Sequence, residues 1–344
     1  MKIGIVTVYE SIDNFGSYLQ AYAMKKYLEL KGHTVFVIQN RPASEVLKKN
    51  LLKLNPKKEF FLRIKKAQLF LADNWRLNIL DRNDVDSRRL DLLIYGSDEI
   101  WNLENPYFCD PFFWGGLYPD IPKLTFAVSI GAMALETEEM YASYFGDLDS
   151  FLRILVRDEK TFGFVKRRTG KMPPIVCDPT MLLPLSYLSE PICGPEKPYL
   201  LVYTYGVDES LCGLIKRYAS QNGLMIVSAC FWHPWADKTL ECSPLQLSSL
   251  MQEADSVFTT TFHGALFSML NHTKCCIYAA REKVQNIVRK LGMSNRLIDE
   301  SCSFEKFESI MKSDFQIQIF EEKLDAWRTY SERELEEALQ CLTK

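Results

Sequence analysis

Residues 3–39 read IGIVTVYESIDNFGSYLQAYAMKKYLELKGHTVFVIQ, and they contain two apolar segments on either side of one helical segment. IGIVTVY (3–9) has no polar alternation, which is typical of a strand buried on both faces. Four apolar residues of the middle segment share one helical face: Leu19, Ala23, Tyr27 and Leu30. Gly32 ends this helix, and TVFVIQ (34–39) is the second strand. A strand, a helix and a strand with short links predict a βαβ unit, and therefore a parallel sheet.

Similar apolar segments recur along the rest of the chain. Further strands are expected at 91–96, 124–131, 153–157, 174–178, 199–206, 224–230, 256–261 and 275–280. The segment from 184 to 198 is rich in proline and glycine and is the expected linker. The sequence therefore predicts an α/β fold with two doubly wound Rossmann-like domains, at 1–185 and 196–318. A final amphipathic helix is expected at 319–344, with its apolar stripe at Phe320, Leu324, Trp327, Leu335, Ala338 and Leu342.

The composition excludes several classes of protein. The 344 residues are 47% hydrophobic and 25% charged, and the net charge of −3 lacks the basic surplus of a nucleic-acid-binding protein. No segment is apolar over the length of a membrane span, and MKIGIVTVYE does not resemble a signal peptide. We read Cys177, Cys230, Cys275 and Cys276 as small core residues, because they lie in or beside apolar segments. A reduced, cytoplasmic, two-domain protein is expected.

Small and polar residues follow the predicted strands at their carboxyl ends, where doubly wound domains bind ligands. In the first half these residues are Asp13, Asn14, Gly16, Ser97, Asp98, Trp101 and Ser129. The loop at 13–17 opens a helix and could hold an anion, Asp98 could accept hydrogen bonds from sugar hydroxyls, and Trp101 could stack on a sugar ring. Helix capping by the polar residues and core packing by Trp101 are the structural alternatives.

Arg157 and His263 stand at the ends of two other predicted strands. Arg157, in VRDEKT, could pair with its neighbours Asp158 or Glu159, or it could bind a carboxylate or phosphate. His263, one of only four histidines, lies in SVFTTTFHGALFSML (256–270), directly before Gly264. A strand end would direct the imidazole towards a ligand, and Gly264 would leave the following helix N-terminus open to an anion. A histidine bonded within its own loop is the structural alternative.

The chain resembles the polysaccharide pyruvyl transferases in five segments: DNFGSYLQAYAM, GSDEIWN, VRDEKT, CDPTMLL and ADSVFTTTFHGALFS. They stand in the family's order and span nearly the whole chain. The resemblance implies a GT-B-like fold in which the C-terminal helix returns to the first domain. It also implies transfer of a pyruvyl group from phosphoenolpyruvate to two hydroxyls of a sugar, in a surface polysaccharide or its precursor, to form a ketal.

The resemblance also implies roles for individual residues. His263 and Arg157 would be catalytic and would bind the donor, together with Thr261 and Gly264. An imidazole titrates near neutral pH, so His263 suits either acid–base chemistry or phosphate binding. A further donor-binding cation would come from Lys283 or from Arg281, and the sequence leaves the choice between these two open.

We therefore assign the second domain to the donor side and the polar loops of the first domain to the acceptor side. No His, Cys or Asp cluster has metal-ligand spacing, so no metal or other cofactor is expected beside the phosphoenolpyruvate co-substrate.

One departure from the family keeps other functions open. Some members carry an arginine two positions before the histidine, where this chain has Thr261. The loss of one phosphate-binding charge favours two alternatives: a GT-B glycosyltransferase that uses a nucleotide sugar, with FWHPWAD (231–237) as a stacking segment, or a non-catalytic member in polysaccharide assembly.

LKKNLLKLNPKKEFFLRIKK (47–66) is the one strongly basic stretch, and it lies in an expected helical insertion of the first domain at about 43–90. A basic amphipathic helix can bind an anionic membrane surface, where it would meet a lipid-linked saccharide acceptor at the inner face of the membrane. Lys57, Lys58, Lys65 and Lys66 would contact that surface. The alternative is an inserted helical hairpin whose apolar side packs on the domain and whose charged face is solvated.

Overall fold

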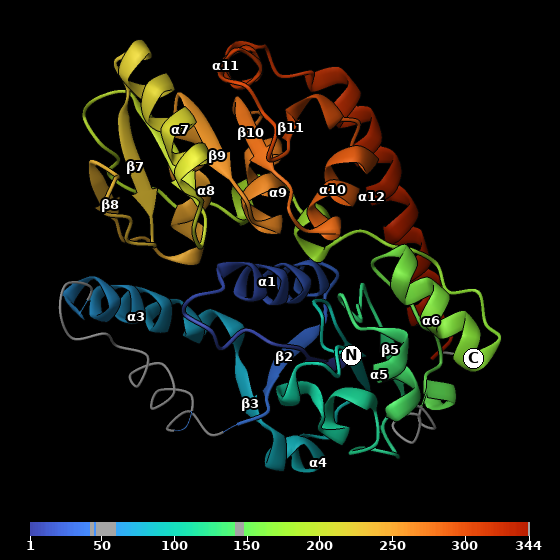
Figure 1. Cartoon of the computed structure of the whole chain (residues 1–344). Helices are drawn as coiled ribbons and strands as arrows, with labels where there is room; N and C mark the ends of the chain where they lie inside the picture. Colours follow the sequence, from blue (N-terminus) through green and yellow to red (C-terminus); the bar gives the residue numbers. More distant parts are fainter. Residues whose placement is uncertain (42–44, 46–59, 142–147, 343–344) are drawn as a thin grey trace. The chain divides into compact units, whose positions relative to one another are not determined.

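The computed structural model describes residues 1–41, 45, 60–141 and 148–342, and the chain divides into two compact units (Figure 1). Unit 1 comprises Met1–Leu52, Asp73–Pro184 and Ala326–Lys344. Unit 2 comprises Lys53–Ala72 and Leu185–Asp325. The long second stretch of unit 2 thus begins at the start of the proline- and glycine-rich segment.

Unit 1 contains a five-stranded parallel sheet with the order β3-β2-β1-β4-β5. Its strands are β1 (Lys2–Val6), β2 (Thr34–Gln39), β3 (Ile79–Asp81), β4 (Leu92–Tyr95) and β5 (Lys123–Thr125). β1 pairs with both β2 and β4, and four of its five residues are buried, as expected for a central strand. The strand order reverses between β1 and β4, and Rossmann-like sheets bind ligands at the carboxyl ends of the strands that flank such a reversal.

The edge of this sheet beyond β5 consists of single parallel bridges. Leu124 bridges Arg153, and Val156 bridges both Val128 and Ile175. The sequence predicted continuous strands here, at 124–131, 153–157 and 174–178. Ala127 interrupts the first of them, because its φ of 54° lies in the left-handed region, which is incompatible with a regular strand.

The helices of unit 1 cover its sheet. They are α1 (Phe15–Leu30), α4 (Val85–Arg88), α5 (Leu135–Met140) and α6 (Glu159–Thr169), with 3₁₀ turns η1 (Trp75–Leu77), η2 (Arg82–Asp84), η3 (Pro106–Phe108), η4 (Pro111–Trp114) and η6 (Pro179–Met181). α1 lies against β2. The main apolar core of the unit includes Tyr95, Trp101, Trp114, Phe151 and Phe164.

Unit 2 contains a six-stranded parallel sheet with the order β11-β10-β9-β6-β7-β8. Its strands are β6 (Tyr199–Tyr203), β7 (Met225–Ala229), β8 (Lys238–Leu240), β9 (Ser256–Thr259), β10 (Cys275–Tyr278) and β11 (Leu297–Ile298). β6 is central and pairs with β7 and β9, so this sheet reverses between β6 and β9 as the first sheet does between β1 and β4. Both units therefore have Rossmann-like strand order.

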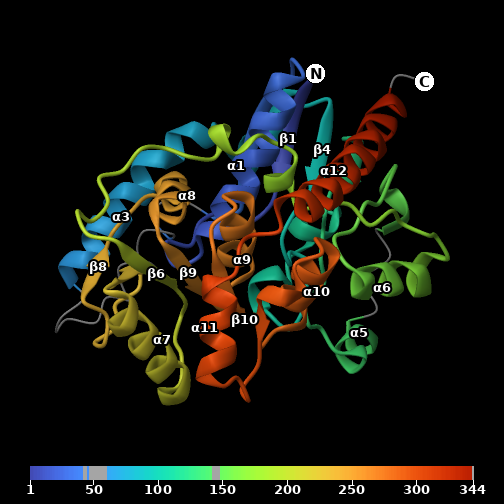
Figure 2. The same ribbon diagram turned by 90° about the horizontal axis from the view of Figure 1, so that it is seen from above.

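Helices cover both faces of the second sheet. α7 (Glu209–Asn222) and α11 (Phe304–Lys312) pack on one face, where Leu200, Val202 and Phe258 contribute to a shared core. α8 (Pro244–Glu253), α9 (Phe262–Leu270) and α10 (Glu282–Lys290) complete the unit with η7 (Leu185–Tyr187) and η8 (Ser294–Arg296). α8 and α10 both pack against α9 (Figure 2). Ser243 and Gln246 form a capping box at the start of α8.

α12 (Ile317–Gln340) begins in unit 2 and continues into unit 1 from Ala326. The predicted apolar stripe is confirmed, since Phe320, Leu324, Trp327, Leu335 and Ala338 are buried and Leu342 is half-buried. In unit 1 the helix makes three hydrogen bonds to the segment after the sheet edge: Trp327 Nε1 to Ile175 O at 3.2 Å, Arg328 Nε to Met181 O at 2.6 Å, and Cys177 N to Ser331 Oγ at 2.8 Å. The return of this helix to the first domain is therefore confirmed.

α3 (Phe60–Asn74) carries the described part of the basic stretch, and residues 47–59, including Lys57 and Lys58, lie outside the described residues. The expected insertion at 43–90 is not one helical piece of the first domain, because β3 lies in its second half and residues 60–72 of α3 belong to unit 2. Lys66 is only 2% exposed, donates from Nζ to Cys230 O at 3.1 Å, and lies 4.4 Å from the centre of the Phe231 ring. The expectation that Lys66 faces solvent or a membrane is therefore wrong.

Lys66→Glu should lower the free energy of unfolding by about 3 kcal/mol, because it places a carboxylate against a buried carbonyl oxygen and an aromatic face. Lys65→Glu is the matched control, since Lys65 is exposed one position away, and it should change stability by less than about 0.5 kcal/mol. Chemical denaturation of the two variants measures this difference. Equal midpoints would contradict the buried role of Lys66.

Candidate active site

A buried polar network joins the loops that follow β1 and β4 in unit 1. Thr7 Oγ1 donates to Ser97 O at 3.1 Å, and Gln20 Nε2, from α1, donates to Thr7 Oγ1 at 2.9 Å and to Val8 O at 2.9 Å. Ser97 N and Oγ both donate to Gln20 Oε1, at 3.1 and 2.8 Å. Diverging loops cannot pair as strands, so the Gln20 amide satisfies their backbone groups instead. The sequence did not single out Gln20; its one signal is that it is the polar residue in the apolar stretch YLQAYAM (18–24) of α1.

The loop at 13–17 has the geometry of a helix cap. Asn14 is the N-cap of α1, and its Oδ1 accepts from Ser17 N at 3.3 Å. Ser17 Oγ donates back to Asn14 O at 2.8 Å, while Gly16 is buried in the first turn and Asp13 is half-buried. The capping alternative therefore describes Asn14, and Ser97 is likewise engaged within the unit.

Trp101 is a core residue, which corrects its assignment as a sugar-stacking side chain. It is 0% exposed and stacks on Trp114 with ring centres 5.2 Å apart. Phe151 and Phe164 contact it edge-on, and Trp101 Nε1 donates to Phe113 O at 2.9 Å. Its ring faces are thus covered by other aromatic side chains.

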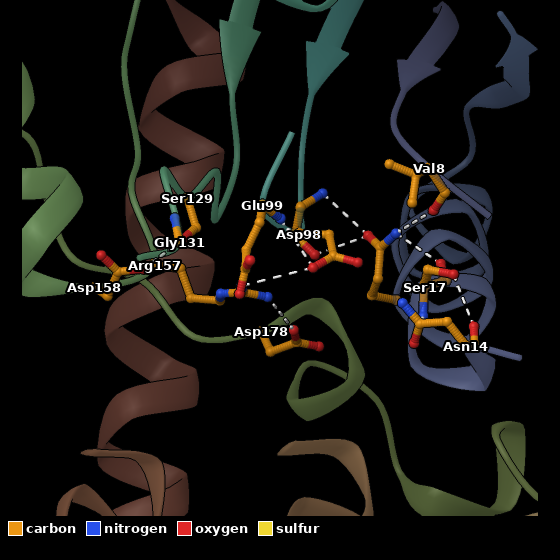
Figure 3. Close-up of polar contacts among 12 residues, drawn as sticks. Val8, Asn14, Ser17, Asp98, Glu99, Ser129, Gly131, Arg157, Asp158 and Asp178 are labelled. Atoms are coloured by element: carbon orange, nitrogen blue, oxygen red, sulfur yellow. Dashed lines mark hydrogen bonds and ion pairs between the residues drawn. The ribbon is translucent and has the colours of Figure 1, made fainter. Parts of the chain in front are cut away.

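Arg157 lies among carboxylates of unit 1. Its guanidinium is 3.8 Å from Asp98 Oδ1 and 3.5 Å from Asp178 Oδ2. Figure 3 shows that Glu99 also lies next to Arg157. Burial opposes the charge, but Asp98, Asp178, Asp158 and Glu99 outweigh it and raise the pKa of Arg157 above its ordinary value. The ion-pair partners of Arg157 are therefore Asp98 and Asp178, and not the adjacent Glu159. Asp178 also accepts from Thr180 N at 3.1 Å, so it has a structural role as the N-cap of η6.

Ser129 belongs to the same sheet end. Its Oγ donates to Asp158 Oδ2 at 2.6 Å and accepts from Gly131 N at 2.9 Å. Asp158 is the N-cap of α6, and its Oδ1 accepts from Thr161 N at 2.8 Å. Unit 1 thus brings Ser97, Asp98, Ser129 and Arg157 to neighbouring strand ends, as the sequence predicted, while each makes contacts within the unit.

In unit 2 a set of threonines joins the loops that follow β6 and β9. Thr204 Oγ1 and Thr260 Oγ1 lie 2.6 Å apart and share a hydrogen bond, and Thr259 Oγ1 donates to Tyr203 O at 2.7 Å. Thr261 is the N-cap of α9, and its Oγ1 accepts from Gly264 N at 2.9 Å. The three threonines at 259–261 therefore hold the start of α9 at the reversal point of the sheet. The sequence missed Thr204, whose only signal is its place near the end of a predicted strand, directly after the observed β6.

His263 occupies the first turn of α9, directly after this threonine set. It is 9% exposed, and its ring contacts Phe262 edge-on with centres 5.0 Å apart. Gly264 does not leave the helix N-terminus open, because its N–H already binds Thr261. A Cβ at Gly264 would lie 2.1 Å from Thr259 Oγ1 and 2.5 Å from Thr261 Oγ1, so the glycine is required by packing.

Arg281 and Lys283 lie at the carboxyl end of the adjacent strand β10. Arg281 is exposed and is the N-cap residue of α10, while Lys283 is half-buried in its first turn. β10 pairs with β9 and α10 packs against α9, so these two cations and His263 stand at neighbouring strand ends of one sheet. That Arg157 of unit 1 meets them stays a prediction. Among the described residues, no group of three His, Cys, Asp or Glu side chains is placed to hold a metal ion.

Comparison with known proteins decides the family. A family model described as polysaccharide pyruvyl transferase matches residues 14–280, which is well over half of the chain. The chain belongs to the polysaccharide pyruvyl transferase family. The matched region contains β4 of the first reversal point, both strands of the second, β6 and β9, and all of the residues assigned above to the donor side except Arg281 and Lys283. None of the curated proteins matches the chain in sequence.

Solved structures show the fold of this family member. The UDP-GlcNAc 2-epimerase from Methanocaldococcus jannaschii is 9% identical, with a TM-score of 0.56, over 92% of this chain and 93% of its own. The UDP-GlcNAc 2-epimerase from Neisseria meningitidis, bound to UDP-GlcNAc, is 10% identical with a TM-score of 0.55, over 99% and 100%. The glycosyltransferase SnogD from Streptomyces nogalater is 12% identical with a TM-score of 0.50, over 100% and 99%. The prediction of two Rossmann-like domains in a GT-B-like fold is confirmed. Within the described ranges, each helix of this pyruvyl transferase family member is too short or too polar to cross a membrane.

Arg157→Met should lower the free energy of unfolding by about 3 kcal/mol, because it leaves the carboxylates of Asp98 and Asp178 without their buried cation. The Asp178 side chain is 0% exposed, so Asp178→Asn in the same molecule should restore part of the loss. The control is Arg153→Met, whose partner Glu334 lies 2.6 Å away but whose side chain is 33% exposed; it should cost less than about 1 kcal/mol. A loss for Arg157→Met no larger than for the control would contradict a buried ion cluster.

Gly264→Ala should cost about 2 kcal/mol or more, because the added methyl group overlaps two threonine hydroxyls. Gly213→Ala, on the exposed side of α7 where a Cβ meets nothing within 4 Å, should instead stabilise by about 0.5–1 kcal/mol through helix propensity. Thermal unfolding of the two variants gives the comparison. A Gly264→Ala variant as stable as the wild type, or more stable, would show that the α9 start is loosely packed.

Proposed function

We propose that the protein transfers a pyruvyl group from phosphoenolpyruvate to a pair of sugar hydroxyls, in a surface polysaccharide or its lipid-linked precursor, and forms a pyruvate ketal. The observation that carries the proposal is the position of His263, in a family-matched segment, at the reversal point of the second sheet. We further propose a cytoplasmic reaction with peripheral contact at the inner face of the membrane. The exposed Lys65 of α3, rather than the buried Lys66, would contribute to that contact.

The donor side is proposed at the carboxyl ends of β9 and β10. Phosphoenolpyruvate carries a phosphate and a carboxylate on one small carbon frame, so its site needs several positive groups close together. Arg281 and Lys283 supply side-chain cations and His263 supplies an imidazole at neighbouring strand ends, and the N-termini of α9 and α10 add the partial positive charge of their backbone dipoles. Thr261 supplies a hydroxyl that caps α9, where some family members carry an arginine.

The reaction consumes no other reactant. Protonation of the methylene carbon of phosphoenolpyruvate makes the central carbon electrophilic, and one sugar hydroxyl oxygen attacks it. The bond from that carbon to the phosphate oxygen then breaks, a second sugar hydroxyl closes the ring, and the two hydroxyl protons are accounted for by the new methyl group and by phosphate. His263 is proposed as the acid or base for these transfers, or as a phosphate ligand, since a positioned imidazole can serve each role.

Arg157 is proposed as a further donor-binding residue. Its distances to Asp98 and Asp178, 3.8 and 3.5 Å, are long for charge-assisted bonds, which favours exchange of a carboxylate for an anionic donor. The negative charge of the same two carboxylates opposes the approach of phosphoenolpyruvate. The acceptor side is proposed at the strand ends of unit 1, with Asp13, Asn14, Gly16, Ser97, Asp98 and Ser129 as its residues. Trp101 is withdrawn from this set because it is buried in the core.

The test is phosphate release from phosphoenolpyruvate in the presence of pyruvate-free bacterial oligosaccharides. His263→Ala should lower turnover by about 100-fold or more if the imidazole transfers a proton. His33→Ala, a histidine of unit 1 near the N-terminus, should leave turnover unchanged. Equal turnover in the two variants would refute the role of His263, and no release by the wild-type protein with any oligosaccharide would refute pyruvyl transfer.

A nucleotide-sugar glycosyltransferase is the second candidate, and one observation favours it. The rings of Tyr205 and Phe231 lie 5.0 Å apart near the carboxyl ends of β6 and β7, and Tyr205 is 55% exposed, so a nucleobase could stack there. Stabilisation on heating by UDP- or GDP-sugars but not by phosphoenolpyruvate would favour this candidate. A non-catalytic family member is the third: the absence of an arginine at Thr261 favours it, and binding of phosphoenolpyruvate without turnover would identify it.

A further inference from the structure

A second polar cluster lies in unit 1 at the carboxyl ends of β1, β2 and β3, apart from the Arg157 carboxylates. We call it the Tyr9 cluster, and it consists of Tyr9, Glu10, Asn40, Arg41, Asp81, Arg82, Tyr107 and Asp110. Six of its members lie at the ends of three adjacent parallel strands, which is the ligand-binding edge of the sheet, and Tyr107 and Asp110 come from the connection between β4 and β5. The family resemblance assigned none of them a role.

The Tyr9 hydroxyl is the unusual group in this cluster. Tyr9 is 2% exposed, and its oxygen has no hydrogen-bond partner, although nearly all buried hydroxyls in proteins have one. Burial, with Glu10, Tyr107 and Asp81 nearby, raises the pKa of Tyr9 well above its ordinary value. The hydroxyl therefore keeps its proton and remains a hydrogen-bond donor near Glu10, Asp81 and Tyr107.

Tyr107 connects the members around Tyr9. Its hydroxyl donates to Glu10 Oε2 at 3.0 Å, and the Arg41 guanidinium lies 4.8 Å from the centre of its ring. On the β3 side, Arg82 pairs with Asp110 at 3.1 Å and also donates to Asn40. The side chains of Arg82 and Asp110 are 27% and 31% exposed, so this side of the cluster is reached from solvent.

The composition of the cluster identifies the chemistry of a ligand. Three carboxylates and two guanidinium groups leave a net charge of −1, which opposes an anion such as phosphoenolpyruvate. Carboxylate and amide oxygens accept hydrogen bonds from hydroxyls, while tyrosine and guanidinium groups donate to ring and hydroxyl oxygens. An uncharged molecule with several adjacent hydroxyls matches this mixture of donors and acceptors.

We propose that the Tyr9 cluster is a saccharide-binding subsite for the acceptor, in which the Tyr9 hydroxyl donates to an oxygen of the sugar. The proposal deepens the function proposed above and, as an acceptor subsite, rests on it. The binding itself needs no phosphoenolpyruvate and is tested without it.

Saturation-transfer NMR with methyl β-D-galactopyranoside, methyl β-D-glucopyranoside and methyl α-D-mannopyranoside as probes tests the subsite. The wild-type protein should transfer saturation to at least one glycoside, and Tyr9→Phe should weaken its binding by roughly five- to tenfold through the loss of one hydrogen bond. Tyr9→Phe removes only an oxygen that has no protein partner, so its unfolding midpoint should be equal to or above that of the wild type. Arg41→Ala should weaken the binding of the same glycoside.

Tyr187→Phe, in unit 2, is the matched control and should bind like the wild type. No transfer to any of the glycosides, or equal transfer in Tyr9→Phe and the wild type, would overturn the subsite. Glycoside binding that Tyr9→Phe weakens, in a protein that releases no phosphate from phosphoenolpyruvate, would support the subsite while refuting pyruvyl transfer.

Discussion

Side-chain hydrogen bonds close the reversal point of each sheet, and the arrangement of both candidate sites depends on them. Where the strand order reverses, the loops after β1 and β4 diverge, as do those after β6 and β9, so their backbone groups have no neighbouring strand to pair with. Thr7 and Gln20 satisfy these groups in unit 1, and Thr204 with Thr260 joins the corresponding loops in unit 2. The residues that follow, Asp98 in one unit and His263 in the other, are thereby held on rigid strand ends instead of on mobile loops.

The two reversal points differ in charge although their topology is alike. In unit 1 the guanidinium of Arg157 is surrounded by carboxylates, and the Tyr9 cluster also has more carboxylates than cations. In unit 2 the neighbouring strand ends present His263, Arg281 and Lys283 beside two helix N-termini. The carboxylate-rich strand ends of unit 1 suit the hydroxyls of a sugar, and the basic strand ends of unit 2 suit a small dianion. It is the physical basis for placing the acceptor on the first unit and the donor on the second.

The sequence predicted most of the fold because buried parallel strands are continuous apolar segments; TVFVIQ coincides with β2 from Thr34 to Gln39. It missed β3, β8 and β11, which have only two or three residues and carry no periodic signal. It identified the strand ends that hold Asp98, Arg157 and His263, but not how their charges are compensated. The pairing of Arg157 with Asp178 joins residues far apart in the chain, and the burial of Trp101 depends on Trp114 and Phe151; neither relation is written in a local pattern.

Each unit is assembled from separated pieces of the chain, and α12 belongs to both. Trp327 and Ser331 complete the edge of unit 1, yet residues 185–325 of unit 2 are synthesised between that edge and the helix that covers it. During translation, Ile175 and Cys177 therefore lack their hydrogen-bond partners on α12 until the whole second sheet has been synthesised. Unit 1 is thus completed after unit 2, although its sheet comes first in the chain.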